Sequence, residues 1–292
     1  MSQCSAFEQR CRCRPSSPLA PVMNISFDRR LSATRRCCHA SPGRGYREGV
    51  PTPDADAVAR HPHLAVELPI GWVRVDMHSH TMWSGDSTTT PDEIASAVLT
   101  SGIDVLCITD HNTIRGAVEL AETLPCRVII GEELKTHAGE IIGLFLTERI
   151  PVGVSPAQAA ELIRAQGGLV YIPHPFDPMR RNLAEGPMRE LAEAGLIDAI
   201  EVVNAKTSLE SLNRKAAAFA EEFDLAAGAG SDAHVPLALG AAYVEMPDFD
   251  GATDFLAKLR VARSVGHHWD EARPWSARIV PSTGTGFGTG FS

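Results

Sequence analysis

The strongest constraint on the fold is a regular alternation of strand-length apolar runs with patterns of helical length. The apolar runs span residues 73–77, 105–109, 127–131, 141–146, 169–172, 199–203, 226–229 and 241–246. The helical patterns span residues 91–100, 114–123, 156–165, 187–194, 209–223 and 252–261. Such alternation predicts parallel strands joined by crossover helices. Seven or eight repeats within about 190 residues favour a small α/β barrel over an open sheet.

Metal-ligand side chains follow six of these strands directly. They are His78 and His80, Asp110 and His111, Glu132 and Glu133, His174 and Asp177, Asn204, and Asp232 and His234. One such residue is usually a hydrogen-bonded loop residue or a helix cap. Barrel enzymes, however, place their chemistry at the carboxyl ends of the strands, and residues i and i+2 of a strand share a face. The pattern therefore predicts that these groups converge on divalent metal ions.

These residues resemble the PHP family (polymerase and histidinol phosphatase) over roughly residues 73–265. The motifs are Asp76-Met-His78-Ser-His80, Thr109-Asp110-His111-Asn112, Gly131-Glu132-Glu133, His174-Pro-Phe, Glu201-Val-Val-Asn204 and Gly230-Ser-Asp232-Ala-His234. The resemblance implies an α/β fold, a distorted (β/α)7 barrel of the PHP type. It also implies two or three divalent metal ions, commonly manganese, iron or zinc, with magnesium as a further candidate.

The resemblance also implies a ligand set, which is His78, His80, Glu133 and Asp232 for one metal, Glu133 and His174 for a second, and Asp86, His111 and His234 for a third. Asp86 lies one residue further from His80 than is common in the family, so we expect a local bulge. Glu140 stands where many members carry a histidine, and an oxygen ligand there favours manganese or magnesium. Glu132 competes with Glu133 for the bridging position, which the third residue of Gly-x-Glu usually takes.

The predicted chemistry is hydrolysis of a phosphate ester, with Asp232, His234 and His111 as the catalytic residues. Metal ions about 3.5–4 Å apart can hold a bridging hydroxide as nucleophile and neutralise the phosphoryl oxygens. Alternatively, His234 or His111 protonates the leaving oxygen.

Other polar residues are candidates for binding substrate or supporting the ligands. Arg180 and Arg181 either bind a phosphate with a bidentate fork or form surface salt bridges. Asn204 contacts the substrate or supports the ligands, and Asp76 and Asp110 are expected to orient imidazoles.

The substrate we expect first is a small phosphate monoester, and next a nucleotide or an oligonucleotide end. About three residues separate the helix ending near position 123 from the next strand, so no inserted cap domain fits there. We expect no polymerase partner in cis. A metal-dependent amidohydrolase with a carboxylated lysine such as Lys135, and a non-catalytic metal-binding module, remain the competing classes.

The chain divides into three expected parts. Residues 1–68 form an Arg-, Ser- and Cys-rich extension of low order, 69–270 the PHP-like domain, and 271–292 a flexible Gly/Thr-rich tail. Cys107 and Cys126 lie in apolar runs without a disulfide pattern, which favours the cytoplasm, and organellar targeting by the Arg-rich front is the alternative. No apolar run reaches the roughly 18 residues of a membrane span. The formal net charge of -9 also disfavours unassisted binding to nucleic-acid backbones.

Overall fold

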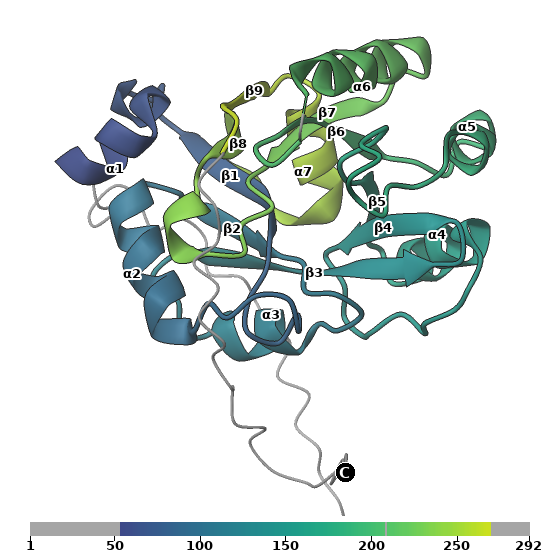
Figure 1. Cartoon of the computed structure of the whole chain (residues 1–292), viewed down its shortest axis with the longest axis horizontal. Coiled ribbons are helices and arrows are strands. Elements are labelled where there is room, and N and C mark those ends of the chain that lie inside the picture. Colours follow the sequence, from purple (N-terminus) through teal and green to yellow (C-terminus); the bar gives the residue numbers. More distant parts are fainter. Residues whose placement is uncertain (1–52, 208, 270–292) are drawn as a thin grey trace, which may run out of the picture. The chain divides into compact units, whose positions relative to one another are not determined.

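The computed structural model describes residues 53–207 and 209–269 (Figure 1). One 9-stranded sheet has the order β7-β6-β5-β4-β3-β2-β1-β8-β9. Its strands are β1 (Trp72–Ser79), β2 (Val105–Ile108), β3 (Arg127–Thr136), β4 (Gly139–Leu144), β5 (Leu169–Ile172), β6 (Ala199–Asn204), β7 (Ala226–Gly230), β8 (Ala242–Pro247) and β9 (Arg263–Gly266). The helices are α1 (Ala55–Arg60), α2 (Pro91–Ser101), α3 (Arg115–Leu120), α4 (Pro156–Ala165), α5 (Glu185–Glu193), α6 (Glu210–Glu222) and α7 (Gly251–Leu259), with 3-10 turns η1 (Pro62–Ala65) and η2 (Pro236–Ala238).

All eight predicted strands and all six predicted helices are present, but the expectation of a wholly parallel sheet is wrong. β4 pairs antiparallel with both β3 and β5, and β8 pairs antiparallel with β1 and β9. Only residues 137 and 138 separate β3 from β4. So short a connection can form a hairpin but not a crossover. The short strand β9 was not predicted.

The sheet is nearly closed into a barrel, because the chain leaving β7 meets the end of β1. The Asp232 backbone N–H donates to the His78 carbonyl oxygen at 2.7 Å, and the His80 N–H donates to the Ala233 carbonyl oxygen at 2.9 Å. Ser79 and Ala233 form a parallel bridge at the same place. The predicted barrel is therefore confirmed, and its closure joins two segments that carry predicted metal ligands.

A bulge in β1 decides which side chains face the barrel interior. Val75 pairs with Val105 and Ser79 pairs with Ile108, so β1 has one residue more than β2 over this interval. An extra residue reverses the alternation of faces beyond the bulge. Val75 consequently faces the barrel interior, where it packs in the hydrophobic cluster. His78, three residues further on, also faces the interior and contacts Glu201.

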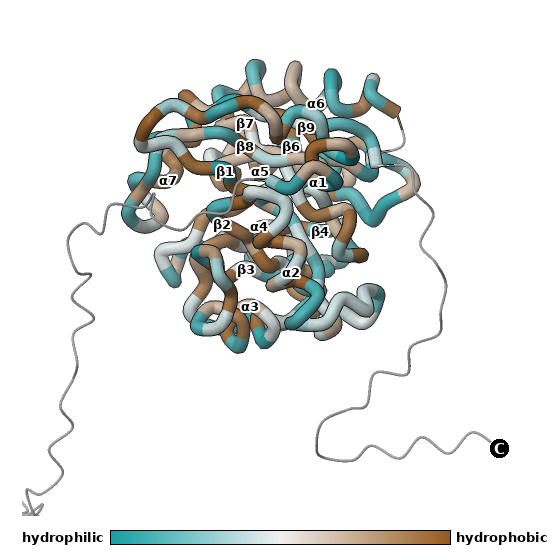
Figure 2. Tube along the Cα trace, turned by 90° about the vertical axis from the view of Figure 1, so that its left-hand side faces the viewer, coloured by the Kyte–Doolittle hydropathy of each residue, from teal (hydrophilic) through white to brown (hydrophobic). Residues whose placement is uncertain are grey.

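Side chains fill the lower barrel, and helices cover its outer surface. Cys107, Ile142, Tyr171 and Met246 belong to one interior cluster, together with Phe255 of α7. Helices α4, α5 and α6 pack on the side formed by β4, β5 and β6, and α2 and α3 pack near β2 (Figure 1). Figure 2 shows hydrophobic and hydrophilic residues alternating along α6, as expected for a helix with one buried face.

Two helices begin with the cap-plus-proline pattern that the sequence contains. Thr90 and Ser155 accept hydrogen bonds from the N–H groups of Glu93 and Gln158, whose side chains bond back to the caps. Each capping box satisfies two backbone donors that the first turn leaves without helical partners. These caps fix where α2 and α4 start above the strands.

The folded part begins earlier than residue 69, the boundary we expected. Residues 53–68 contain α1 and η1, whose Ala57 and Leu64 are buried in the cluster that contains Ile94 of α2. The polar composition hid these short helices, since only Val58 packs against that cluster beside these two side chains. The predictions for residues 1–52 and 271–292 lie outside the described residues. Every helix in the described residues is too short or too polar to cross a bilayer.

Candidate metal centre

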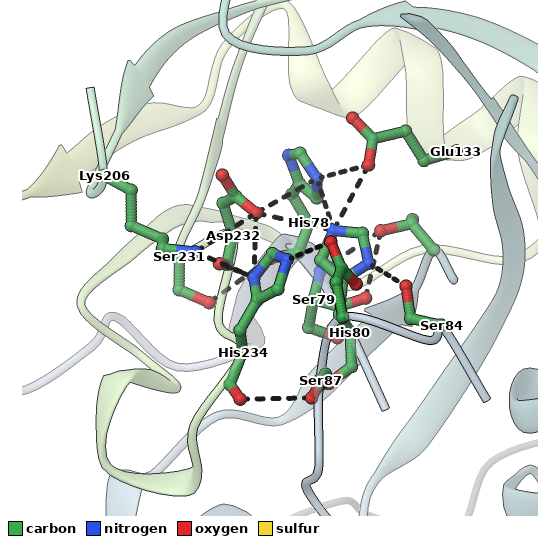
Figure 3. Close-up of polar contacts among 12 residues, drawn as sticks. His78, Ser79, His80, Ser84, Ser87, Glu133, Lys206, Ser231, Asp232 and His234 are labelled. Carbon is green, nitrogen blue, oxygen red and sulfur yellow. Dashed lines mark hydrogen bonds and ion pairs between the residues drawn. The ribbon is translucent and has the colours of Figure 1, made fainter. Parts of the chain in front are cut away.

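The nine predicted metal ligands converge at the carboxyl end of the barrel. They form four overlapping groups, in each of which one ligand atom per residue lies within 4.8 Å of the others. The groups are His80, Asp86, His111 and His234; His78, His80 and Glu133; His78, His174 and Asp232; and His111, Glu133 and Glu140. Figure 3 shows His78, His80, Asp232 and His234 pointing toward one another, with Glu133 meeting the first two.

Glu133 lies at the centre of these groups. Its Oε1 is 2.9 Å from Nε2 of His174, and its Oε2 is 3.1 Å from Nδ1 of His111 and 3.3 Å from Nε2 of His80. Glu132 faces the other side of β3, where its Oε2 accepts a hydrogen bond from the Ile150 N–H at 2.9 Å. Alternation along the strand thus gives Glu133 the position from which one carboxylate can bridge two cations.

The loop after β1 brings Asp86 to the open side of the site. Asp86 Oδ2 lies 3.1 Å from Nε2 of both His111 and His234, and the Asp86 side chain is 41% exposed. The Ser84 N–H closes a turn onto the Thr81 carbonyl, and Gly85 adopts a φ of 81°. The positive φ, which glycine adopts without steric cost, accommodates the extra residue in this loop.

Glu140 enters the site from β4 and belongs to the group with His111 and Glu133. Its Oε1 lies 3.8 Å from Nδ1 of His111, and its Oε2 lies 3.7 Å from Nε2 of His174. Burial and the neighbouring charge of Glu133 raise the pKa of Glu140 to about 7. A carboxylate held this way would lose its proton readily to an approaching cation, so the position is suited to an oxygen ligand.

Two of the converging residues have a left-handed backbone. The φ angles are 30° for His174 and 50° for Asp232, and neither residue is a glycine. Such conformations cost on the order of 1–3 kcal/mol each and persist where the surrounding structure enforces them. Here the enforcing contacts include the 2.7 Å bond from the Asp232 N–H to His78 and a 2.6 Å bond from the His174 N–H to Glu201.

The groups that orient the imidazoles differ from those we expected. Glu201 of β6 is fully buried and accepts from Nδ1 of His78 at 3.2 Å, and Ser84 Oγ lies 2.9 Å from Nδ1 of His80. Asp76 instead accepts from the backbone N–H groups of Ser231 and Gly240, and Asp110 accepts from Thr81. The expected role of Asp76 and Asp110 is therefore corrected: they fix the loops that carry the ligands. The motif Glu-Val-Val-Asn contained Glu201, but its role depends on the register of β6.

The predicted substrate-binding residues separate into three different environments. Arg180 reaches the site, with one guanidinium nitrogen 3.6 Å from Asp232 Oδ2. Arg181 is exposed, and only its backbone carbonyl has a described contact, with the Glu140 N–H. Asn204 is buried and donates to Glu201 at 2.9 Å, so it supports the site from behind. Lys206, which we did not predict, has its Nζ 2.8 Å from Nδ1 of His234.

Mutual attraction between carboxylates and imidazoles dominates the electrostatics of the site. Burial opposes protonation of His80, but hydrogen bonds to Asp232 and Glu133 outweigh it and raise the pKa of His80 to about 9. Burial likewise opposes the charge on Glu133, yet the neighbouring histidines, His78 first among them, hold its pKa well below the usual value. Burial and the neighbouring His80 lower the pKa of His234 to about 3.

This donor set fits divalent cations. Imidazoles and carboxylates are the ligands that zinc, iron and manganese use in proteins. The buried carboxylates raise the pKa values of His78 and His80, and a cation would take the place of the protons that these rings bind. Nδ1 of His111, which lies 3.1 Å from Oε2 of Glu133, is also buried without a hydrogen-bond partner among the described residues, as the nitrogen of an imidazole ligand would be before a metal binds.

Comparison with known proteins agrees with this geometry. Sequence models of the PHP domain and of the PHP-associated region match residues 76–183 and 210–264. Two uncharacterized proteins of Methanocaldococcus jannaschii are similar. One is 42% identical over 146 residues, which are 46% of this chain and 82% of that protein. The other is 35% identical over 198 residues, which are 65% of this chain and 80% of that protein. A two-domain protein of Bacteroides vulgatus that contains a predicted PHP-like metal-dependent phosphoesterase has a similar fold, with a TM-score of 0.56 and 19% identity over 69% of this chain and 68% of that one. The chain therefore belongs to the PHP family.

Proposed function

We propose that the protein is a metal-dependent hydrolase of phosphate esters. The observation that carries this proposal is the position of Glu133, whose two carboxylate oxygens face different imidazoles, His174 on one side and His80 and His111 on the other. A bridging carboxylate between imidazole clusters is what a site for two or more neighbouring cations requires. Small phosphate monoesters are the substrate class that we propose first, and nucleotide or oligonucleotide ends come second.

The nine converging side chains would hold two or three divalent ions, with Mn²⁺, Fe²⁺ or Zn²⁺ favoured and Mg²⁺ allowed by the oxygen ligand Glu140. Bound cations supply an activated water as nucleophile and neutralise the phosphoryl oxygens. Nε2 of His234 faces Asp86 at 3.1 Å within a group that could hold a cation, and Nδ1 lies 2.8 Å from the Asp232 carbonyl oxygen. His234, Asp232 and His111 therefore act in this proposal by holding cations rather than by passing protons.

Access to the site is from the side of Asp86, the most exposed of the nine side chains. Arg180 lies beside Asp232 with its side chain 25% exposed, so its guanidinium can meet both the carboxylate and an entering anion. Glu201 and Ser84 keep the rings of His78 and His80 oriented while the substrate binds. Such supporting contacts typically change metal affinity or activity by about 10–100-fold when they are removed.

The test is metal analysis of the purified chain followed by a phosphate-release screen over nucleotides, sugar phosphates and histidinol phosphate. We expect His78→Ala or Asp232→Asn to abolish release and to leave the fold largely intact. His137→Ala is the matched control, because His137 is exposed in the turn after β3. Unchanged release in both site variants would refute the proposal.

The same screen distinguishes the competing classes. Turnover of a cyclic amide without phosphate release would favour an amidohydrolase, whose carboxylated lysine would take the bridging position that Glu133 occupies here. Full metal occupancy without any turnover would favour a metal-binding module. A reducing compartment is part of the proposal, and it is supported by Cys107 and Cys126, which are both buried and free.

A further inference from the structure

Lys206 is placed at the candidate metal centre by the loop that follows β6. Its side chain is only 13% exposed, and its Nζ lies 2.8 Å from Nδ1 of His234 and 3.9 Å from Oδ1 of Asp232 (Figure 3). The Lys206 N–H donates to the side chain of Asn204 at 2.8 Å, which fixes the backbone from which the lysine extends. An ammonium group is thus held within reach of two candidate ligands.

The contact between Lys206 and His234 is incompatible with a metal-loaded His234. Nε2 of His234 faces Asp86 and belongs to the group that could hold a cation. A neutral imidazole that binds a cation through Nε2 carries its proton on Nδ1. That N–H has an acceptor in place, the Asp232 carbonyl oxygen at 2.8 Å. Because an ammonium group has only donors, Lys206 would then have to exchange His234 for an acceptor.

A second cationic side chain lies beside the same carboxylate. Arg180 has a guanidinium nitrogen 3.6 Å from Oδ2 of Asp232, and the same nitrogen donates to the Lys206 carbonyl oxygen at 3.4 Å. When Asp232 shares its negative charge with a bound cation, it holds both basic groups less strongly. Two positive charges next to a cation site match an anion that carries two charges on several oxygens.

We propose that Lys206, together with Arg180, binds the phosphoryl oxygens of the substrate and makes the site prefer phosphate monoesters over diesters. This proposal rests on the proposed phosphoesterase function and names the residue that would set its substrate class. A monoester presents a dianionic terminal phosphate with three free oxygens, whereas a diester presents one charge and two. Loading the site with metal would release Lys206 from His234 and make its ammonium available.

The expected effects follow from the strength of a charge-assisted hydrogen bond. Lys206→Gln keeps a polar side chain, one atom shorter, but removes the charge, so the affinity of the manganese-loaded protein for inorganic phosphate should fall about 10- to 100-fold. Lys206→Arg keeps the charge and should recover most of that affinity. The ratio of kcat/KM for p-nitrophenyl phosphate to that for its methyl diester should fall at least about fivefold in Lys206→Gln.

The experiment is a calorimetric titration of inorganic phosphate into the manganese-loaded full chain, with metal content and thermal unfolding measured for each variant. Lys215→Gln is the matched control, since Lys215 pairs with Glu185 on the surface of α6 and is 50% exposed. Phosphate affinity in Lys206→Gln within twofold of wild type would overturn the proposal. Absence of phosphate binding by the wild type would also overturn it. Loss of metal in the variant would do the same, because Lys206 would then support the metal ligand His234 instead of binding substrate.

The two proposals fail in different ways. If the wild-type protein binds phosphate through Lys206 but releases phosphate from no ester, the phosphoesterase function fails and the phosphate site stands. If it hydrolyses esters and Lys206→Gln hydrolyses monoesters and diesters in the same ratio as wild type, the function stands and the role of Lys206 is refuted.

Discussion

Gly230→Ala should disable the metal centre by adding a single methyl group. A Cβ on Gly230 would lie 2.3 Å from the Cβ of His78, 2.8 Å from the His78 backbone nitrogen and 2.7 Å from Oε1 of Glu201. Ordinary carbon contacts begin near 3.4 Å, so β1 and β7 would have to separate by about 1 Å. Two of the three contacted atoms belong to His78 itself, and the third belongs to the carboxylate that orients its ring.

The displacement would reach both sides of the site. The Asp232 N–H bonds to the His78 carbonyl at 2.7 Å, two residues beyond Gly230, so movement of one ligand pulls the other. Overpacking of this kind costs about 1–3 kcal/mol of stability. Misplacement of two ligands should weaken manganese binding at least about tenfold, by analogy with the loss of supporting contacts.

The assay is a manganese titration with metal analysis and thermal unfolding of the same samples. Gly186→Ala is the matched control: Gly186 lies in α5, where an added Cβ would meet nothing within 4 Å. Alanine there should leave metal binding unchanged and stabilise the helix by up to about 1 kcal/mol. Manganese affinity and melting temperature in Gly230→Ala equal to those of wild type would refute the packing argument.

Two further predictions concern charge. Glu133→Gln should weaken metal binding at least about tenfold. Glu132→Gln, on the opposite face of β3, should change it less than about twofold in the same titration. Equal losses in the two variants would contradict the assignment of Glu133 to the site and Glu132 to the opposite face. The pKa of His80 is raised from 6.5 to about 9, so this group stabilises the metal-free protein below pH 6.5 and loses that contribution, about 3 kcal/mol, as the pH rises to 9. Metal binding, which displaces the proton, should strengthen over the same pH range. Denaturant titrations would measure the change in stability, and calorimetry in buffers of different ionisation enthalpy would measure the proton released on metal binding.

Strands and ligands were predictable because both depend on short stretches of sequence. An apolar run and the histidine that follows it, such as Ile172 and His174, stay adjacent whatever the rest of the chain does. Strand direction depends instead on which neighbours pair. The prediction failed at β4, where the hairpin with β3 replaces a crossover.

The supporting residues were harder to predict, since their roles depend on which way each side chain points. Arg180 and Arg181 are identical in type and adjacent in sequence, yet only Arg180 lies at the site. Asp76 is next to a ligand motif but faces outward, and Glu201 lies 123 residues from the ring of His78 that it contacts. Distinguishing these residues requires the register of β1 and β6, which periodicity alone does not provide.

The bulge in β1 has a consequence for anyone who redesigns this barrel. One surplus residue lets the same strand supply aliphatic packing for the floor of the barrel and imidazoles for its mouth. Val75 and His78 are three positions apart, so the same sequence paired as a regular strand without the bulge would turn both rings of the His-Ser-His motif toward the helices outside, although every ligand would still be encoded. Counting residues along this strand therefore matters as much as choosing them.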